Sequence, residues 1–368
     1  MKKRLLALSI ATTLLLAGCK GEPVEQMKES PVVTEPPEQQ VEEVKRELHH
    51  LDADLASFHF VADWLSDKEV VFVEKKEGLY EVKRFNMITG AIDTIYEDPS
   101  IIIDVLIHPS KDFLLIHTSD NPLSATVKIL SMEGSVEDEV VVESSELGIE
   151  WNDSDPSRIL LTAFHEDWSF DLFLYDGHED YLELVDLEDP FPKWFGKDLI
   201  ASGHIEDHAL DGGTIEIYDP ATGNQRDLEL ADIVYFDTYR DNLLAVQVDE
   251  KEEAIYTWME TDGTIRHQWK MPAVSNYSEW VIPEMAWVSD DEMFMTSPEI
   301  GGLIDEMQSP MQLIQMKGTQ QKVVADEVEA VKPRCSPSGN RCLTGFTSET
   351  LIHTETGEKE TWLSFPEN

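Results

Sequence analysis

Two short segments carry side chains of the kinds that bind metal ions. His204 and His208 lie within five residues, but the zinc motif HExxH requires glutamate directly after the first histidine, and isoleucine stands there. Asn152, Asp153 and Asp155 could offer oxygens to calcium, yet the glycine and distal glutamate of an EF-hand are missing. We therefore expect a solvated loop at the histidines and a turn in which Asn and Asp bond their own backbone. No metal or other cofactor is predicted.

Motifs for catalytic nucleophiles are absent, since the sequence contains neither a GxSxG elbow nor a P-loop. Asp and Glu total 74 residues, so a carboxylate pair for glycoside hydrolysis cannot be recognised without its spatial separation. The tryptophans at repeat turns hold fixed positions, which favours core packing over sugar binding for the whole set: Trp64, Trp151, Trp168, Trp194, Trp258, Trp269, Trp280, Trp287 and Trp362. No catalytic residue is predicted.

The N-terminus has the pattern of an export signal. Residues 2–4 are basic, and residues 5–17 form an apolar run that is too short to span a bilayer. The run ends in Leu16-Ala17-Gly18-Cys19, which resembles the lipobox of bacterial lipoproteins. The resemblance implies that residues 1–18 are cleaved as a signal peptide and that Cys19 carries a diacylglycerol. An ordinary secretory signal with a chance cysteine is the alternative.

Two further cysteines remain, Cys335 and Cys342. An even number in an oxidising compartment suggests a disulfide. They flank a turn-rich stretch of six residues that would join two strands, so they can face each other across an antiparallel pair. Two free thiols are the alternative.

Composition separates a linker from a folded domain. Residues 19–50 are rich in Glu, Gln and Pro without aromatic residues, which predicts a disordered acidic linker, and residues 51–368 form the folded domain. The net charge is −46, and removing residues 1–18 with three basic groups makes it −49. Such a charge excludes nucleic acid, whose binding depends on phosphate neutralisation. We interpret it as the solvated acidic surface of an exported protein, with a calcium-dependent protein as the alternative.

The folded domain repeats two turn signatures in fixed order. Five apolar runs read as buried strands: 70–73, 113–116, 159–162, 243–246 and 292–295. The first signature is a polar turn with Asp or Asn, and its copies start at Trp64, His108, Trp151, Trp194, Asp237, Trp287 and Cys335. The second is a glycine turn, at Gly90, Gly134, Gly177, Gly223, Gly263, Gly318 and Gly357.

A spacing of about 40–45 residues with about four strands per repeat is typical of a β-propeller blade. The fold class is therefore all-β, a β-propeller with seven repeats. A β-sandwich would not account for two turn signatures in fixed order. If the ring closes, the terminal repeats must share a blade or pack edge to edge, because an open ring leaves unpaired strands. We therefore expect the segment Thr361–Phe365 to pair close to Phe58–Val61.

The repeats also carry a family resemblance. Trp64–Asp67, followed by Leu79–Val82 and Gly90, resembles the degenerate blades of TolB-type propellers, and Ile215–Asp219 with Gly223 repeats the pattern. With the lipobox and the acidic linker, the whole chain resembles the YqgU-like propeller lipoproteins of Bacillus-type bacteria. That family is described as six-bladed, so six blades stay open as the alternative to seven. It has no assigned activity to transfer.

Two functions are consistent with these features. The first is a binding or scaffold module, anchored in the cell membrane through its lipid and facing away from the cytoplasm, which docks an envelope protein or peptide. The second is a secreted hydrolase with a site at the central channel of the propeller. The missing catalytic motifs favour the first, although propellers host both classes. The partner itself is not identified by the sequence.

Overall fold

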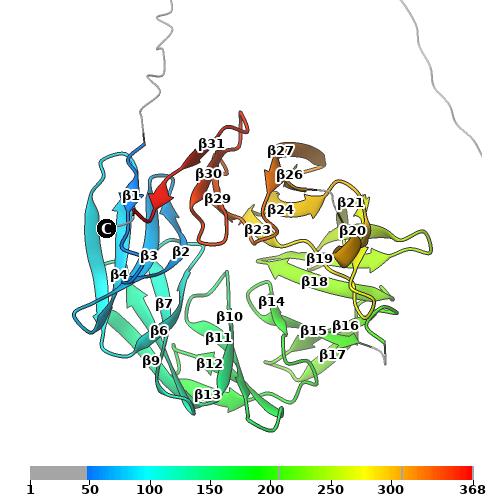
Figure 1. Ribbon diagram of the computed structural model, residues 1–368. Coiled ribbons are helices and arrows are strands. Elements are labelled where there is room, and N and C mark those ends of the chain that lie inside the picture. Colours follow the sequence, from blue (N-terminus) through cyan, green and yellow to red (C-terminus); the bar gives the residue numbers. More distant parts are fainter. Residues whose placement is uncertain (1–47, 206–207, 308–309, 367–368) are drawn as a thin grey trace, which may run out of the picture. The chain divides into compact units, whose positions relative to one another are not determined.

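The computed structural model describes residues 48–205, 208–307 and 310–366 (Figure 1). They belong to one compact unit, Arg46–Asn368, which begins a few residues before the expected boundary at 51. Leu48 is already buried in it. The expected signal peptide, Cys19 and most of the expected linker lie outside the described residues. Within the described ranges, no helix is long and apolar enough to cross a membrane.

Blades 1 to 3 are separate four-stranded antiparallel sheets. Blade 1 contains β2 (Phe58–Ser66), β3 (Glu69–Lys76), β4 (Leu79–Asn86) and β5 (Ile92–Asp98). Blade 2 contains β6 (Ile101–Ile107), β7 (Phe113–Asn121), β8 (Ser124–Ser131) and β9 (Val136–Glu143). Blade 3 contains β10 (Glu146–Trp151), β11 (Arg158–Phe164), β12 (Phe170–Asp176) and β13 (Tyr181–Leu184).

Blades 4 and 5 are joined into one eight-stranded sheet by a single bridge between Gly213 and Ile233. Blade 4 contains β14 (Lys193–Phe195), β15 (Leu199–Ile205), β16 (Gly213–Asp219) and β17 (Asn224–Asp227). Blade 5 contains β18 (Ile233–Tyr239), β19 (Asn242–Val248), β20 (Glu253–Glu260) and β21 (Ile265–Pro272).

Blades 6 and 7 are again separate four-stranded sheets. Blade 6 contains β23 (Met285–Ser289), β24 (Glu292–Pro298), β26 (Met311–Lys317) and β27 (Gln320–Val328). Blade 7 contains β28 (Arg334–Cys335), β29 (Arg341–Thr344), β30 (Thr350–His353) and β31 (Lys359–Thr361). Two short parallel pairs complete the described strands: β1 (Leu51–Asp52) with β32 (Leu363–Ser364), and β22 (Val274–Ser275) with β25 (Gly302–Leu303). One 3-10 segment, Ile304–Glu306, follows β25.

The blades follow one another around a ring in chain order, with the first strand of each nearest the axis (Figure 1). The five apolar runs expected as strands lie in β3, β7, β11, β19 and β24, each of which is the second strand of its blade. Their central residues are almost completely buried. The second strand has a neighbouring strand on each edge and packed side chains on both faces, which explains its continuous apolar sequence.

Both turn signatures are confirmed. Every copy of the first joins the first and second strands of a blade, and every glycine of the second joins the third and fourth. Gly134 shows why glycine is used, because its φ is +83° and a Cβ there would lie 1.9 Å from the carbonyl oxygen of Ile95 in blade 1. The described part of the chain therefore holds seven blades.

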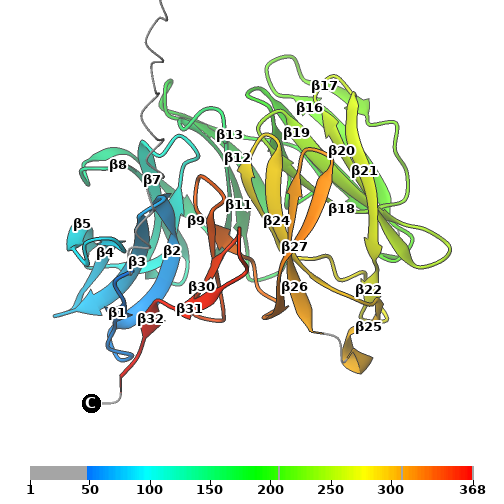
Figure 2. The same cartoon turned by 90° about the horizontal axis from the view of Figure 1, so that it is seen from above.

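Strand alternation places the connections on two opposite faces. The turn face carries the connections between first and second and between third and fourth strands, and these are the two signatures. The loop face carries the second-to-third connections and the links between blades, which comprise residues 53–57, 77–78, 99–100, 121–123, 144–145, 165–169, 185–192, 208–212, 228–232, 249–252, 273–284, 299–307, 329–333 and 345–349. Seen from the edge, β25 and the 3-10 segment project beyond the strands of blade 6 (Figure 2).

Hydrogen bonds join neighbouring blades along the turn face. Blade 7 is joined to blade 1 by the bond from Arg341 Nη1 to Asp67 O at 2.8 Å, and blade 2 is joined to blade 1 by the bond from Lys111 Nζ to Trp64 O at 2.9 Å. Blades 2 and 3 are joined through His108 Nε2 and Asn152 O at 3.0 Å, and blades 3 and 4 through Asn152 Nδ2 and Lys197 O at 2.9 Å. Blades 4 and 5 are joined by the bond from Gly196 N to Arg240 O at 2.6 Å. Side chains of the first signature thus form hydrogen bonds with backbone groups of a neighbouring blade, and some, such as Asn152, also bond the backbone of their own turn.

The ring closes between blade 1 and blade 7. Trp64 Nε1 donates to the carbonyl oxygen of Arg334 at 3.0 Å, and Arg334 Nε donates to the carbonyl oxygen of Ala62 at 2.7 Å. In addition, Leu51 pairs with Leu363 in the parallel β1–β32 pair. The two ends of the described chain are therefore linked, but no blade mixes strands from both ends.

The segment Thr361–Phe365 lies close to Phe58–Val61, as expected, and its backbone partner is β1, a few residues before them. Leu363 and Ser364 pair with β1, whereas Phe58 makes only a ring contact with Phe365, at 5.1 Å. Next to this strand, Trp362 stacks on Phe85 of β4, with ring centroids 6.0 Å apart. Both side chains belong to the same core cluster as Leu51 and Leu363.

Most tryptophans lie in the core as expected, and one does not. Trp64, Trp151, Trp194, Trp258, Trp269 and Trp362 are buried, and Trp280 and Trp287 pack partly buried against a core cluster. Trp168 is 91% exposed, so the core prediction is wrong for it. It stands in the turn between β11 and β12 and not in a strand, so no neighbouring blade covers it.

Asp153 lies in the first signature of blade 3, and its carboxylate forms a hydrogen bond with the backbone of blade 5. Its Oδ2 accepts a hydrogen bond from the backbone N–H of Arg240 in blade 5, at 3.3 Å. Burial, followed by the neighbouring charge of Glu150, raises the pKa of Asp153 to about 7. The ionised carboxylate is therefore disfavoured in the folded protein.

We expect Trp64→Phe to lower the free energy of unfolding by about 2 kcal/mol, because it leaves the Arg334 carbonyl unpaired and removes ring volume from the core. Trp168→Phe is the matched control and should change it by less than about 0.5 kcal/mol. Urea unfolding followed by circular dichroism measures both. Equal losses in the two variants would contradict the closing role of Trp64.

We expect Asp153→Asn to stabilise the protein at pH 8 by about 1–2 kcal/mol, since a pKa unit corresponds to about 1.4 kcal/mol and solvent contact reduces the full effect. The sign follows from a folded pKa above the unfolded value, which makes the carboxyl progressively destabilising as pH rises from about 4 to 7. Urea midpoints measured from pH 5 to 8 should therefore converge at the acidic end. A constant difference across that range would refute the raised pKa.

Candidate functional site

Large apolar side chains are exposed unevenly on the two faces. Those in connections lie on the loop face, and they are Leu55, Leu123, Trp168, Phe191, Leu210, Tyr277, Ile300, Ile304 and Phe346. The remaining exposed large apolar side chains of the described residues lie within strands. The turn-face connections of the described chain expose none. Exposed apolar groups in neighbouring loops are typical of an interaction surface.

Two of these side chains, Trp168 and Phe191, lie with two partly buried phenylalanines at blade 3, and we call the four residues the aromatic patch. It consists of Phe164 at the end of β11, Trp168 in the following turn, Phe170 at the start of β12, and Phe191 in the link to blade 4. The ring centroid of Phe164 is 6.2 Å from that of Phe170 and 5.6 Å from that of Phe191. Three phenylalanines thus form a continuous base beside the exposed indole.

Trp168 is held in a conformation that favours glycine. Its φ is +68°, in the left-handed region that is unfavourable for a large side chain. The turn is fixed by local hydrogen bonds, from Trp168 N to His165 O at 3.0 Å and from Ser169 N to Asp167 Oδ1 at 3.1 Å. The turn therefore holds an exposed aromatic ring in a conformation that costs backbone strain.

Phe191 is positioned by the partly buried carboxylate of Asp189. Asp189 Oδ1 accepts from the backbone N–H of Phe191 at 2.8 Å, and Oδ2 accepts from that of Gly203 in β15 at 2.5 Å. Burial raises the pKa of Asp189, although these two bonds oppose the shift. Asp189 therefore connects the link between blades 3 and 4 to β15 of blade 4 and fixes the backbone of Phe191.

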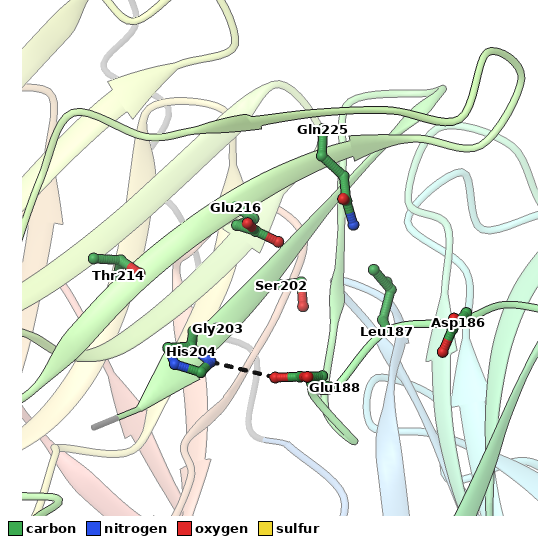
Figure 3. Close-up of a pocket in the computed structure, with 9 residues that line it drawn as sticks. All are labelled: Asp186, Leu187, Glu188, Ser202, Gly203, His204, Thr214, Glu216 and Gln225. Carbon is green, nitrogen blue, oxygen red and sulfur yellow. Dashed lines mark ion pairs between the residues drawn. The ribbon is translucent and has the colours of Figure 1, made fainter. Parts of the chain in front are cut away.

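One pocket opens on the loop face between blades 3 and 4, and we call it the first pocket. Its volume is about 410 Å³, and its lining includes Asp186, Glu188, His204, Glu216 and Gln225 (Figure 3). Figure 3 shows His204 and Glu188 facing each other, and their Nδ1 and Oε2 atoms are 3.6 Å apart. The lining is largely polar, and three of its nine residues are acidic.

The second pocket lies between blades 2 and 3, on the other side of the aromatic patch. Its volume is about 520 Å³, and apolar residues of β6 and β10 line it together with Asp104, His117, Ser145 and Glu146. His117 is 6% exposed, and its Nε2 is buried without a hydrogen-bond partner. Burial lowers the pKa of His117, so the ring is neutral at neutral pH.

The two segments considered as metal sites in the sequence, His204–His208 and Asn152–Asp155, differ in the structure. Among the described residues, no group of three or more His, Cys, Asp or Glu side chains is arranged to hold a metal ion. His204 lines the first pocket and His208 is exposed, while residues 206–207 lie outside the described residues. The turn expected at Asn152 is confirmed, because its Oδ1 accepts from the N–H of Ser154 at 2.8 Å and of Asp155 at 3.0 Å.

Charged side chains also occur on the first strands near the axis, where a hydrolase site was the alternative. Lys193 Nζ is 2.9 Å from Glu150 Oε2 and 3.8 Å from Asp237 Oδ1. The charge of Glu150 raises the pKa of Lys193, and burial raises that of Glu150. Asp237 also accepts from the indole N–H of Trp287 at 3.0 Å. These groups satisfy one another, which is typical of a structural network.

The sequence did not reveal the aromatic patch or the two pockets. The first pocket combines side chains of blade 4 with those of the link before it, and the second combines side chains of blades 2 and 3, so their spacing along the chain differs. The sequence does contain one local signal for Trp168. It is directly preceded by Asp167 and directly followed by Ser169, and both residue types are common in turns. Polar neighbours on both sides indicate a turn and not a core strand.

The pair Cys335 and Cys342 has the expected geometry. The residues are direct partners in the antiparallel β28–β29 pair, and their Sγ atoms are 1.99 Å apart. Cys342 is buried in a core cluster shared by blades 6 and 7, and Cys335 packs against it. The positions allow a bond within the last blade.

Comparisons with solved structures agree on the fold. An uncharacterized protein of Listeria monocytogenes EGD-e, lmo1340, superposes with a TM-score of 0.78 at 19% identity, covering 88% of this chain and 99% of that chain. The β-propeller domain of the Trilobed protease from Pyrococcus furiosus, described as having an open velcro topology, gives a TM-score of 0.53 at 12% identity and covers 84% of this chain and 97% of that one. At these identities the likeness shows the propeller fold alone.

Sequence comparisons identify the family. The uncharacterized lipoprotein YqgU of Bacillus subtilis (strain 168) is 23% identical over 294 residues, which cover 78% of this chain and 80% of that protein. Residues 86–345 match the model of the YqgU-like 6-bladed beta propeller domain. That range contains blades 2 to 6 whole and parts of blades 1 and 7, while the described residues of this chain hold seven four-stranded units. The chain therefore belongs to the YqgU-like six-bladed β-propeller family.

Proposed function

We propose that this protein is a lipid-anchored binding module that works outside the cytoplasm and docks a protein or peptide on the loop face of blade 3. The observation that carries the proposal is Trp168, which is 91% exposed at a φ of +68° beside three clustered phenylalanines. Folding alone gives no reason to keep an indole in this position. A binding partner that buries it would do so, because tryptophan contributes strongly when it is covered at an interface.

The entry point of the chain supports the same assignment. The first described residues lie by the turn face, where the backbone N–H of His49 donates to the carbonyl oxygen of Met87 at 2.8 Å. The aromatic patch lies on the opposite face. A chain that is anchored upstream of Leu48 therefore leaves the loop face free for a partner. The lipoprotein name of the Bacillus subtilis relative is consistent with such an anchor.

We expect Cys19→Ala to move the protein from the membrane fraction to the soluble or exported fraction, because Cys19 would carry the lipid. Mass spectrometry of the wild-type N-terminal peptide should show a diacylglycerol on that cysteine and no residues before it. Cys335→Ala serves as the control and should leave fractionation unchanged. An unmodified Cys19 in the mature protein would rule out the anchor.

We further propose a disulfide between Cys335 and Cys342. A short loop of this kind is expected to add about 2–3 kcal/mol to stability in the chain-entropy view. When the denatured protein is alkylated without reductant, neither cysteine should be labelled, and both should be labelled after reduction. Labelling of both thiols in the unreduced sample would mean that they are two small side chains in the core of the last blade.

We expect the double change Trp168→Ser and Phe191→Ser to abolish capture of envelope proteins by the purified protein. The matched control is Val141→Ser with Leu184→Ser, which removes two exposed apolar side chains from outer strands. Quantitative mass spectrometry of captured proteins compares the three forms. Proteins that are lost with the first pair and retained with the second are the partners. If both pairs behave like the wild type, the loop face of blade 3 is not the docking surface.

A further inference from the structure

The two pockets beside the aromatic patch share one kind of charge. The first pocket is lined by Asp186, Glu188 and Glu216, and the second by Asp104 and Glu146. No lysine or arginine is among the lining residues of either pocket. A surface that alternates an acidic pocket, an apolar patch and a second acidic pocket is complementary to a segment with the order basic, apolar, basic.

Most of these carboxylates are not neutralised by the protein. Within the described ranges, Asp104, Glu146, Asp186 and Glu216 form no ion pair, and the only partner of Glu188 is the exposed His204. Carboxylates elsewhere are neutralised by lysines, as in the pairs Asp98–Lys128 at 2.6 Å, Glu292–Lys317 at 2.7 Å and Asp249–Lys270 at 2.7 Å. The pocket carboxylates therefore remain available to a cation supplied by a partner.

His117 provides a second and independent sign of a ligand. Its ring lines the second pocket, it is 6% exposed, and its Nε2 has no hydrogen-bond partner. An unpaired buried polar atom lowers stability unless a bound group satisfies it. Because burial lowers its pKa, the imidazole is neutral and does not repel a cation in the same pocket.

Both pockets are tied to the aromatic patch by hydrogen bonds. Ser145, in the lining of the second pocket, donates from Oγ to the carbonyl oxygen of Phe164 at 3.0 Å. Gly203, in the lining of the first pocket, donates to Asp189, which also holds the backbone of Phe191. The three sites are therefore parts of one continuous surface.

We infer that the docking segment of the partner is an extended peptide in which an aromatic or large aliphatic residue is flanked on both sides by lysine or arginine. The apolar residue covers Trp168 and the phenylalanine base, and the two cations enter the pockets next to Glu146 and Glu188. The inference rests on the proposed function and specifies its ligand. The strongly acidic chain, with a net charge of −46, also attracts such a segment from a distance.

The test uses a series of fluorescent, end-blocked peptides with a central Phe-Leu pair and a lysine on each side, separated from the pair by one to four glycines. A matched series carries acetyl-lysine, which has nearly the same shape without the charge. Anisotropy titrations against the whole protein should show at least one lysine peptide binding about tenfold more tightly than its acetylated form. Binding should weaken as salt is raised from 50 to 300 mM, because the charges are partly exposed.

Variants locate the binding. Glu146→Gln and Glu188→Gln should each weaken the lysine peptide about three- to tenfold and leave the acetylated peptide unchanged. Glu139→Gln, on the exposed outer strand β9, makes the same change in net charge and should have less than a twofold effect. Circular dichroism melting curves verify that all three variants are folded.

Several outcomes would overturn the inference: no peptide of the series binds, the acetylated peptides bind equally well, or Glu139→Gln has the same effect as the pocket variants. The last result would reduce the effect to general charge attraction. The proposed docking function is judged separately by envelope capture with the Trp168 and Phe191 double variant. Loss of capture there, combined with peptide indifference to charge, would leave the docking function standing and discard the basic ligand.

Discussion

The structure depends on closing a ring whose first and last blades are separately complete. Without a shared blade, backbone pairing cannot join the ends apart from the short β1–β32 pair. The bond from the Trp64 indole to the Arg334 carbonyl carries much of this closure. The same device recurs inside the ring, where Trp194 donates to the Glu150 carbonyl at 3.1 Å and Trp287 donates to Asp237. Closure is thus one more repetition of the contact that joins ordinary neighbours.

This repetition divides the molecule into two chemically different faces. On the turn face, side chains such as His108, Asn152 and Arg341 are used to bond neighbouring blades, so the surface is polar and internally satisfied. The connections of the loop face differ from one another in length and composition. The loop face can therefore display strained and apolar residues such as Trp168 without weakening the ring. Function gathers on loops that a rigid scaffold positions.

The repeats could be predicted from the sequence because their signals are local. A polar turn after Trp64 and a glycine turn at Gly90 reflect requirements of the nearby backbone, and a fully buried second strand needs continuous apolar residues. The aromatic patch and its flanking pockets could not be predicted, because they depend on contacts such as Ser145 with Phe164 and Asp189 with Gly203, which join different blades or links. Trp168 departs from the predicted core set because it lies in a second-to-third-strand connection, a position in the repeat that the buried tryptophans do not occupy.

The separate attachment of β1 has a mechanical consequence. If the chain is anchored by a lipid, tension along the tether reaches Leu48 and His49 first and then β1. This segment is held by the two-residue pairing with β32, by the bond from His49 to Met87 and by the burial of Leu48, Leu51 and Ala53. Peeling of this strand would release the ten residues from Leu48 to Ser57, which is about 35 Å of extended chain. The bonds of Trp64 and Arg334 lie beyond this segment and would not yet bear load. Under force, the segment from Leu48 to Ser57 can therefore detach before blades 1 and 7 separate.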